Sequence, residues 1–180
     1  MTVVEPIRDR KVIEKIEISL KKTNLRDYVL FCLGINSGLR ISDILKLDVS
    51  DVKGKNYLNL TEKKTGKHKI FPINSKLKDI LKFYTQNRAL NEPLFQTKYK
   101  NRMDRITAYR IINNACKDAN IQSNIGTHTL RKTFGYHFYK KYKDVAMLQK
   151  ILNHSTPQIT MTYIGINDEE VWDCCRKFTL

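Results

Sequence analysis

Apolar residues recur at helical spacing in the first 40 residues of the chain. The first stripe follows Pro6, where a helix is expected to start, and consists of Val12, Ile13, Ile16 and Leu20. Asn24 is a suitable cap for a second helix, and Gly38 is a suitable end for it. Residues 28–35 are apolar on every side of that second helix, which predicts that it is buried.

The hydrophobic period changes after this helical region. Residues 57–60 and 69–73 are short and β-prone, and the segment between them contains Gly66 and a group of lysines. This pattern predicts a β-hairpin with a lysine-rich tip.

Helical patterns resume beyond the hairpin. Asn74 or Ser75 caps a helix that Asn91–Pro93 ends. Further helices are expected at 104–119, about 128–142, 144–152, 157–163 and 168–178. The predicted fold class is α+β, predominantly helical with a small antiparallel β-sheet, in a single domain that spans residues 1–180.

Composition narrows the class of partner. The chain has 180 residues, with 33 Lys and Arg against 18 Asp and Glu, which gives a net charge of +15. This surplus favours a polyanion such as DNA, RNA or an anionic membrane, although a merely basic soluble protein has the same composition. The basic residues are spread over the whole chain, which favours a folded basic surface over a basic tail.

Several classes of protein are disfavoured by the sequence. It has no apolar run long enough for a transmembrane helix and no secretory signal. Its four cysteines form no C-x-x-C pair, so neither a disulfide framework nor a structural zinc site is expected. A reducing, cytoplasmic setting is the better prediction.

Four short segments carry candidate chemistry. They are Ser37–Asp43 around Arg40, the hairpin tip with its lysines, Thr127–Thr133, and Leu152–Tyr163. His128 and Arg131 are three residues apart at a helix start, so both lie on one face and suit a phosphate group. Each segment alone has a plainer explanation: a helix end neutralised by an arginine, solvated lysines, or a surface tyrosine.

Together, in this order and spacing, the segments closely resemble the catalytic domain of the tyrosine recombinase (phage integrase) family. S-G-L-R-I-S-D-I-L-K-L and H-T-L-R-K-T-F match two family boxes, and L-N-H-S-T-P-Q-I-T-M-T-Y resembles the third. Asn153 stands where the family usually has Gly. The resemblance covers essentially all of the chain.

The resemblance implies a role for each of six residues. Arg40 and Arg131 are expected to clamp the scissile phosphate, and His154 to hydrogen-bond it. His128 is expected to assist as a hydrogen-bond donor or proton acceptor.

The last two roles are those of the acid and the nucleophile. Lys64, on the hairpin, is the expected general acid, although Lys63 and Lys67 flank it. Tyr163 is the expected nucleophile, which forms a 3′-phosphotyrosine intermediate. The implied reaction is DNA strand cleavage and rejoining by a site-specific recombinase, with no metal, ATP or other cofactor.

The resemblance also implies partners and a setting. The expected partner is double-stranded DNA, on which the chain is expected to self-associate as a tetramer on paired sites. No membrane partner is expected. The expected location is cytoplasmic and nucleoid-associated, in the service of a mobile genetic element. The N-terminal core-binding domain of the family is absent, so the chain is either an excised piece or a naturally short recombinase. The last helix is expected to pack on a neighbouring subunit or on its own domain.

Three alternatives remain open from the sequence. The chain could be a DNA-binding module or recombinase fragment without independent strand transfer. A helix-turn-helix regulator would use the basic helices at 104–119 and 128–142. A topoisomerase of the related type would share the same site residues.

Overall fold

The structure is a computed structural model that describes residues 4–61, 66, 68–166, 172 and 175–179. Its elements, in chain order, are α1 (Arg10–Thr23), α2 (Leu25–Ser37), α3 (Ile41–Ile44), the 3₁₀ turn η1 (Val49–Asp51), β1 (Tyr57–Thr61), β2 (His68–Pro72), α4 (Ser75–Thr85), α5 (Arg105–Asp118), α6 (Thr129–Tyr142), α7 (Val145–Leu152) and α8 (Pro157–Ile164). In this part of the chain, no helix is both long and apolar enough to cross a membrane. The predicted α+β class with a small antiparallel sheet is confirmed.

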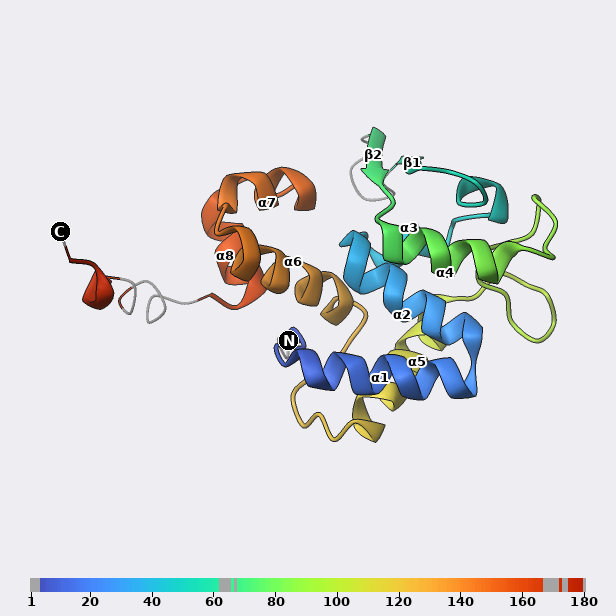
Figure 1. The fold of residues 1–180 in the computed structure, drawn as a ribbon, viewed down its shortest axis with the longest axis horizontal. Helices are drawn as coiled ribbons and strands as arrows, with labels where there is room; N and C mark the ends of the chain where they lie inside the picture. The colour runs from blue at the N-terminus through green and yellow to red at the C-terminus, as the bar shows by residue number, and fades with distance from the viewer. Residues whose placement is uncertain (1–3, 62–65, 67, 167–171, 173–174, 180) are drawn as a thin grey trace.

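Helix α2 is the centre of the larger part of the molecule. It packs against α1, α4 and α6 (Figure 1), and of the predicted buried stretch 28–35, residues 28–34 are buried while Ile35 is half-buried. The Asn24 side chain accepts a hydrogen bond from the Asp27 amide at 3.3 Å, so Asn24 is the expected cap. A Cβ atom on Gly34 would lie 2.4 Å from a Leu130 methyl group, so the glycine allows α6 to approach α2 closely.

The first helix begins later than Pro6. Asp9 caps α1 by accepting a hydrogen bond from the Lys11 amide at 2.8 Å, and the helix starts at Arg10. Residues 4–9 run as an irregular segment beside α6 instead. The helix therefore starts where the Asp9 side chain caps it, and not at the proline.

The predicted hairpin is present. Strands β1 and β2 are antiparallel, with Tyr57 opposite Pro72 and Thr61 opposite His68. Leu58 is fully buried and fixes one face of the hairpin on the core. The hairpin tip, including Lys63, Lys64 and Lys67, lies outside the described residues.

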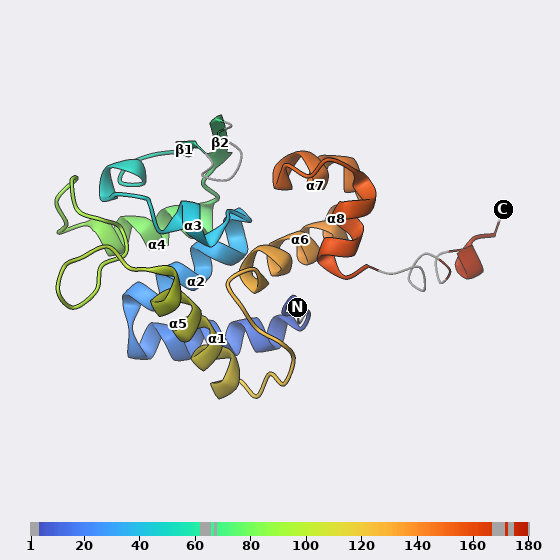
Figure 2. The same cartoon turned by 180° about the vertical axis from the view of Figure 1, so that it is seen from behind.

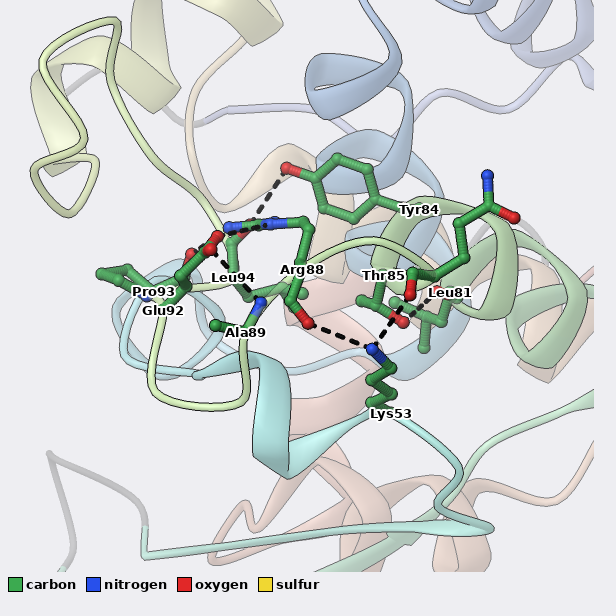
Figure 3. A network of polar contacts seen from close by, with 10 residues as sticks. Lys53, Leu81, Tyr84, Thr85, Arg88, Ala89, Glu92, Pro93 and Leu94 are labelled. Atoms are coloured by element: carbon green, nitrogen blue, oxygen red, sulfur yellow. Dashed lines mark hydrogen bonds and ion pairs between the residues drawn. The ribbon is translucent and has the colours of Figure 1, made fainter.

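A polar network orders the long connection after α4 (Figure 3). Arg88 donates to the carbonyl oxygens of Pro93 and Leu94, each at 2.6 Å, and pairs with Glu92 at 3.0 Å. The Lys53 ammonium donates to the Arg88 carbonyl at 3.0 Å. Helix α4 ends at Thr85, six residues before Asn91, so the predicted helix end was placed too late; these bonds order the turn that follows α4.

Helices α6, α7 and α8 form a second, smaller layer, in which α6 packs on α2. Leu148, Leu152, Ile164 and Ile166 form their own buried cluster, with aromatic residues of α6 packed against it. Figures 1 and 2 show α7 and α8 gathered at the far end of α6, away from α1 and α5. The segment Asn167–Glu170, predicted to start a last helix, lies outside the described residues.

Candidate active site

Arg131 joins three parts of the fold. Its side chain is 3% exposed on α6. Its guanidinium donates to the Gly38 carbonyl at 2.7 Å and also to the Leu152 carbonyl. The end of α2, the start of α6 and the end of α7 are thus held around one cation.

Arg40 directly follows the end of α2. Gly38 is in the left-handed conformation (φ 60°), and Arg40 is extended at the N-cap position of α3. The side chain is half-buried. Its charge lowers the pKa of both His128 and Tyr163, so Arg40 lies within electrostatic range of both side chains.

His128 contacts Tyr163 at the start of α6. Its Nδ1 lies 3.3 Å from the Tyr163 hydroxyl oxygen, and the two rings meet edge to face. Although part of the ring is exposed, desolvation lowers the pKa of His128, and the charges of Arg131 and Arg105 lower it further. A neutral imidazole in this place can accept the phenolic proton.

Tyr163 lies one residue before the end of α8. Thr156 caps this helix by accepting from the Ile159 amide at 3.2 Å, and Pro157 occupies its first turn as predicted. Burial raises the pKa of Tyr163, and the cations Arg131 and Arg40 oppose that rise. The phenol is therefore protonated at rest and needs a base before it can attack.

His154 follows the end of α7. Asn153 adopts a left-handed conformation (φ 51°), which explains why asparagine can replace the usual glycine here. His154 Nδ1 lies 3.1 Å from the Thr160 hydroxyl oxygen, and its ring centroid is 4.9 Å from that of Tyr163. Thr160 thus orients this imidazole beside the phenol.

The structure therefore brings five of the six predicted residues together: Arg40, His128, Arg131, His154 and Tyr163. Lys64 lies outside the described residues. Among the residues that are described, His, Cys, Asp and Glu nowhere gather in a group of three or more that could hold a metal ion.

Two lysines near this site were missed from the sequence. Lys132 lies over the Tyr163 ring, with its Nζ 5.2 Å from the ring centroid. It follows His128 by one helical turn, and this spacing is a signal that could have pointed to it. Lys69, on β2, donates to the Ile151 carbonyl and so fastens the hairpin to the end of α7, which no local pattern indicates.

A combination of a phenol, two imidazoles and buried cations suits attack on an anionic ester. The imidazole beside the phenol can take its proton, and the guanidinium groups can stabilise developing negative charge. The positive charge that draws a phosphate into the site is supplied by protein side chains.

Comparison with known proteins agrees with this geometry. The sequence profile described as the phage integrase family matches residues 9–170. The probable integrase/recombinase YoeC of Bacillus subtilis is 49% identical over 170 residues, which cover 94% of this chain and 93% of that protein. The tyrosine recombinase XerA of Pyrococcus horikoshii is 28% identical, over 87% of this chain and 56% of that protein. The chain thus spans about half the length of some curated relatives.

Solved structures show the same fold. A crystal structure of XerA recombinase superposes with a TM-score of 0.80 at 22% identity, over 98% of this chain and 65% of that one. The catalytic domain of bacteriophage HP1 integrase superposes with a TM-score of 0.67 at 23% identity, over 96% of this chain and 95% of that one. The chain belongs to the phage integrase family, and its fold is that of the tyrosine recombinase catalytic domain.

Proposed function

We propose that this chain is a site-specific recombinase that cuts and rejoins double-stranded DNA through a covalent 3′-phosphotyrosine. The contact between His128 and the Tyr163 hydroxyl, 3.3 Å long and surrounded by cations, is the observation that carries this proposal. Family membership and the relatedness to YoeC support it.

The first step is attack by Tyr163 on the scissile phosphorus. A bond forms between the phenolic oxygen and phosphorus while the phenolic proton passes to His128. The bond from phosphorus to the 5′ oxygen breaks, and that oxygen takes a proton from the general acid. Lys64 is proposed for this last role.

The cations act on the phosphate during this step. Negative charge builds on the phosphate oxygens as the new bond forms, and Arg40, Arg131 and His154 are proposed to stabilise it. Loss of one such donor typically slows catalysis about 100- to 1,000-fold. A residue held as rigidly as Arg131 needs no reorganisation as the charge develops.

Rejoining reverses these bonds. A free 5′ hydroxyl attacks the phosphotyrosine and gives its proton to the deprotonated general acid. The bond from phosphorus to the phenolic oxygen breaks, and Tyr163 regains its proton from His128. Because the phosphotyrosine keeps the energy of the broken ester, strand exchange needs no ATP.

The proposed partner is double-stranded DNA, and the proposed assembly is a tetramer on paired sites. The +15 net charge supports a polyanionic partner. Among similar folds, a lambda integrase dimer is bound to its core site, and XerH is bound to its difH substrate. We further propose that residues 1–180 form a single catalytic domain. The proposed location is cytoplasmic and nucleoid-associated, and the proposed role is in the service of a mobile genetic element.

A trapping experiment tests the function. The chain first selects its own binding sites from random duplexes, and these sites are then built into nicked substrates that lose a short fragment on cleavage. The wild type is expected to give a covalent protein–DNA species on a denaturing gel, and Tyr163→Phe to give none. Binding by both proteins with no covalent species would support the alternative of a DNA-binding module.

A further inference from the structure

Lys132 is an unusually placed cation. Its side chain is 6% exposed, although lysine is rarely buried without a counter-charge. Its ammonium lies 5.2 Å from the centroid of the Tyr163 ring, within the range of a cation–π interaction. The same phenol is flanked by the rings of His128 and His154. Lys132 therefore contributes to the small set of groups that determine where the phenol lies.

The charge of Glu5 acts on this lysine from the N-terminal segment. Burial lowers the pKa of Lys132, while the Glu5 carboxylate acts to raise it. Glu5 also pairs with Arg8 at 3.5 Å, and Arg8 donates to the Gly165 carbonyl at 3.2 Å. The first described residues thus reach both the cation over the tyrosine and the end of the helix that carries it.

This N-terminal segment, residues 4–9, is fixed on α6. The Ile7 amide donates to the Thr133 hydroxyl at 2.9 Å, and His137 Nε2 contacts the Ile7 carbonyl at 2.9 Å. A Cβ on Gly165 would lie 2.9 Å from the Arg8 guanidinium, so the segment packs closely on the end of α8. The backbone of the segment is therefore held against α6 and the end of α8.

We propose that Lys132 is a positioning residue for Tyr163. This inference rests on the proposed function in one respect, that Tyr163 is the nucleophile. An ammonium over the ring face attracts the phenol and attracts the phenolate more strongly, because the phenolate carries a full negative charge. Lys132 thus holds the ring and favours loss of its proton to His128.

Cleavage kinetics provide the first test. Single-turnover formation of the covalent species is compared between the wild type and Lys132→Met, which keeps the length of the side chain without its charge. In Lys132→Met we expect the cleavage rate to fall about tenfold and its pH–rate profile to move to higher pH. In Lys132→Arg we expect the rate to recover. Glu5→Gln is expected to move the rate the same way by a smaller factor.

Lys141→Met is the matched control. Lys141 also lies on α6 over an aromatic ring, with its Nζ 5.1 Å from the centroid of Tyr142, but it is exposed. Its substitution removes the same charge and the same type of contact away from Tyr163. We expect its cleavage rate to stay within twofold of the wild type.

A titration without DNA separates this inference from the proposed function. Protein labelled with 3-fluorotyrosine, whose phenol is more acidic, is followed by ¹⁹F NMR, and the Tyr163 signal is assigned with Tyr163→Phe. The titratable and charged groups that face this phenol are Arg40, Arg131, His128, His154 and Lys132. Lys132→Met should raise the pKa of this phenol, and Lys132→Arg and Lys141→Met should leave it near the wild-type value.

Clear results would overturn the inference. An unchanged Tyr163 titration and an unchanged pH–rate profile in Lys132→Met mean that the lysine is only a packing element. An equal loss in Lys132→Met and Lys132→Arg leads to the same conclusion. If Lys132→Met does not fold, Lys132→Gln, which also removes the charge, takes its place; an unshifted Tyr163 titration in that variant rejects the proposal.

Discussion

The body, formed by α1–α5, and the layer, formed by α6–α8, differ in the size of their apolar cores and in the site residues that they carry. The body has a large continuous apolar core around α2, whereas the layer has a small cluster around Leu148 and Ile164. Yet the layer carries His128, Arg131 and Tyr163, and the body supplies Arg40. The comparison teaches that most of the stability lies in the body and most of the candidate site lies in the layer. Arg131, bonded to both, is one of the connections between them.

The largest effect is expected where the two regions meet. Arg131→Ala leaves the Gly38 and Leu152 carbonyls without their buried donor, which should lower the free energy of unfolding by about 3 kcal/mol. It should also slow covalent cleavage about 100- to 1,000-fold. Denaturant unfolding and single-turnover cleavage measure the two losses. A variant that loses only cleavage would show that the arginine does not connect the regions.

A pair of leucine substitutions sharpens the comparison. Leu30→Ala in the body should cost about 2 to 5 kcal/mol of global stability, because the large core cannot collapse around the cavity. Leu148→Ala in the layer should act locally, with faster hydrogen exchange in α7 and α8 and little change in α2. Both leucines are fully buried, so they are matched in exposure. Equal loss of protection in both regions would contradict the division.

The pH dependence of cleavage tests the chemistry of the layer. The lowered pKa of His128 keeps its imidazole neutral below the ordinary histidine value of about 6.5. The cleavage rate should therefore hold through pH 6.5 and fall at lower pH, with a limiting slope of about tenfold per pH unit as the base is protonated. His128→Gln should be slower and should lose this acidic limb. A decline that begins well above pH 6.5 would exclude His128 as the base.

The smallest effect is expected at the end of α7. Asn153 has φ 51°, so Asn153→Ala should lower the free energy of unfolding by about 1 kcal/mol, and Asn153→Gly should be neutral or stabilising. Thermal unfolding measures both variants. A tolerated alanine would mean that this turn can relax without disturbing His154.

Much of the fold could be predicted from the sequence because its signals are local. The caps Asn24 and Thr156 and the end at Gly38 are short-range features, and the structure confirms each of them. The start of α1 was misplaced because the Asp9 cap competed with Pro6. The 3₁₀ turn at Val49–Asp51 was missed because a turn of this length has no period.

The candidate site, like the fold, was predicted from the sequence only in part. The five described site residues stand in sequence motifs, and the structure brings them together as the resemblance implies. The spacing from His128 could have pointed to Lys132, but its contact with Tyr163 and that of Lys69 with Ile151 join positions 31 and 82 residues apart. The first contact follows from how α8 packs on α6 and the second from how the layer packs on the body, and no local spacing encodes either.

Mapping the covalent bond is the most direct test of the central claim, that this site makes Tyr163 a nucleophile toward DNA. After cleavage of a nicked substrate, nuclease and protease digestion followed by mass spectrometry identifies the modified residue among the nine tyrosines. We predict a 3′-nucleotide phosphate on the peptide that contains Tyr163 and on no other. A linkage to another residue, or cleaved DNA that ends in a free 3′ phosphate with no protein attached, would contradict the account.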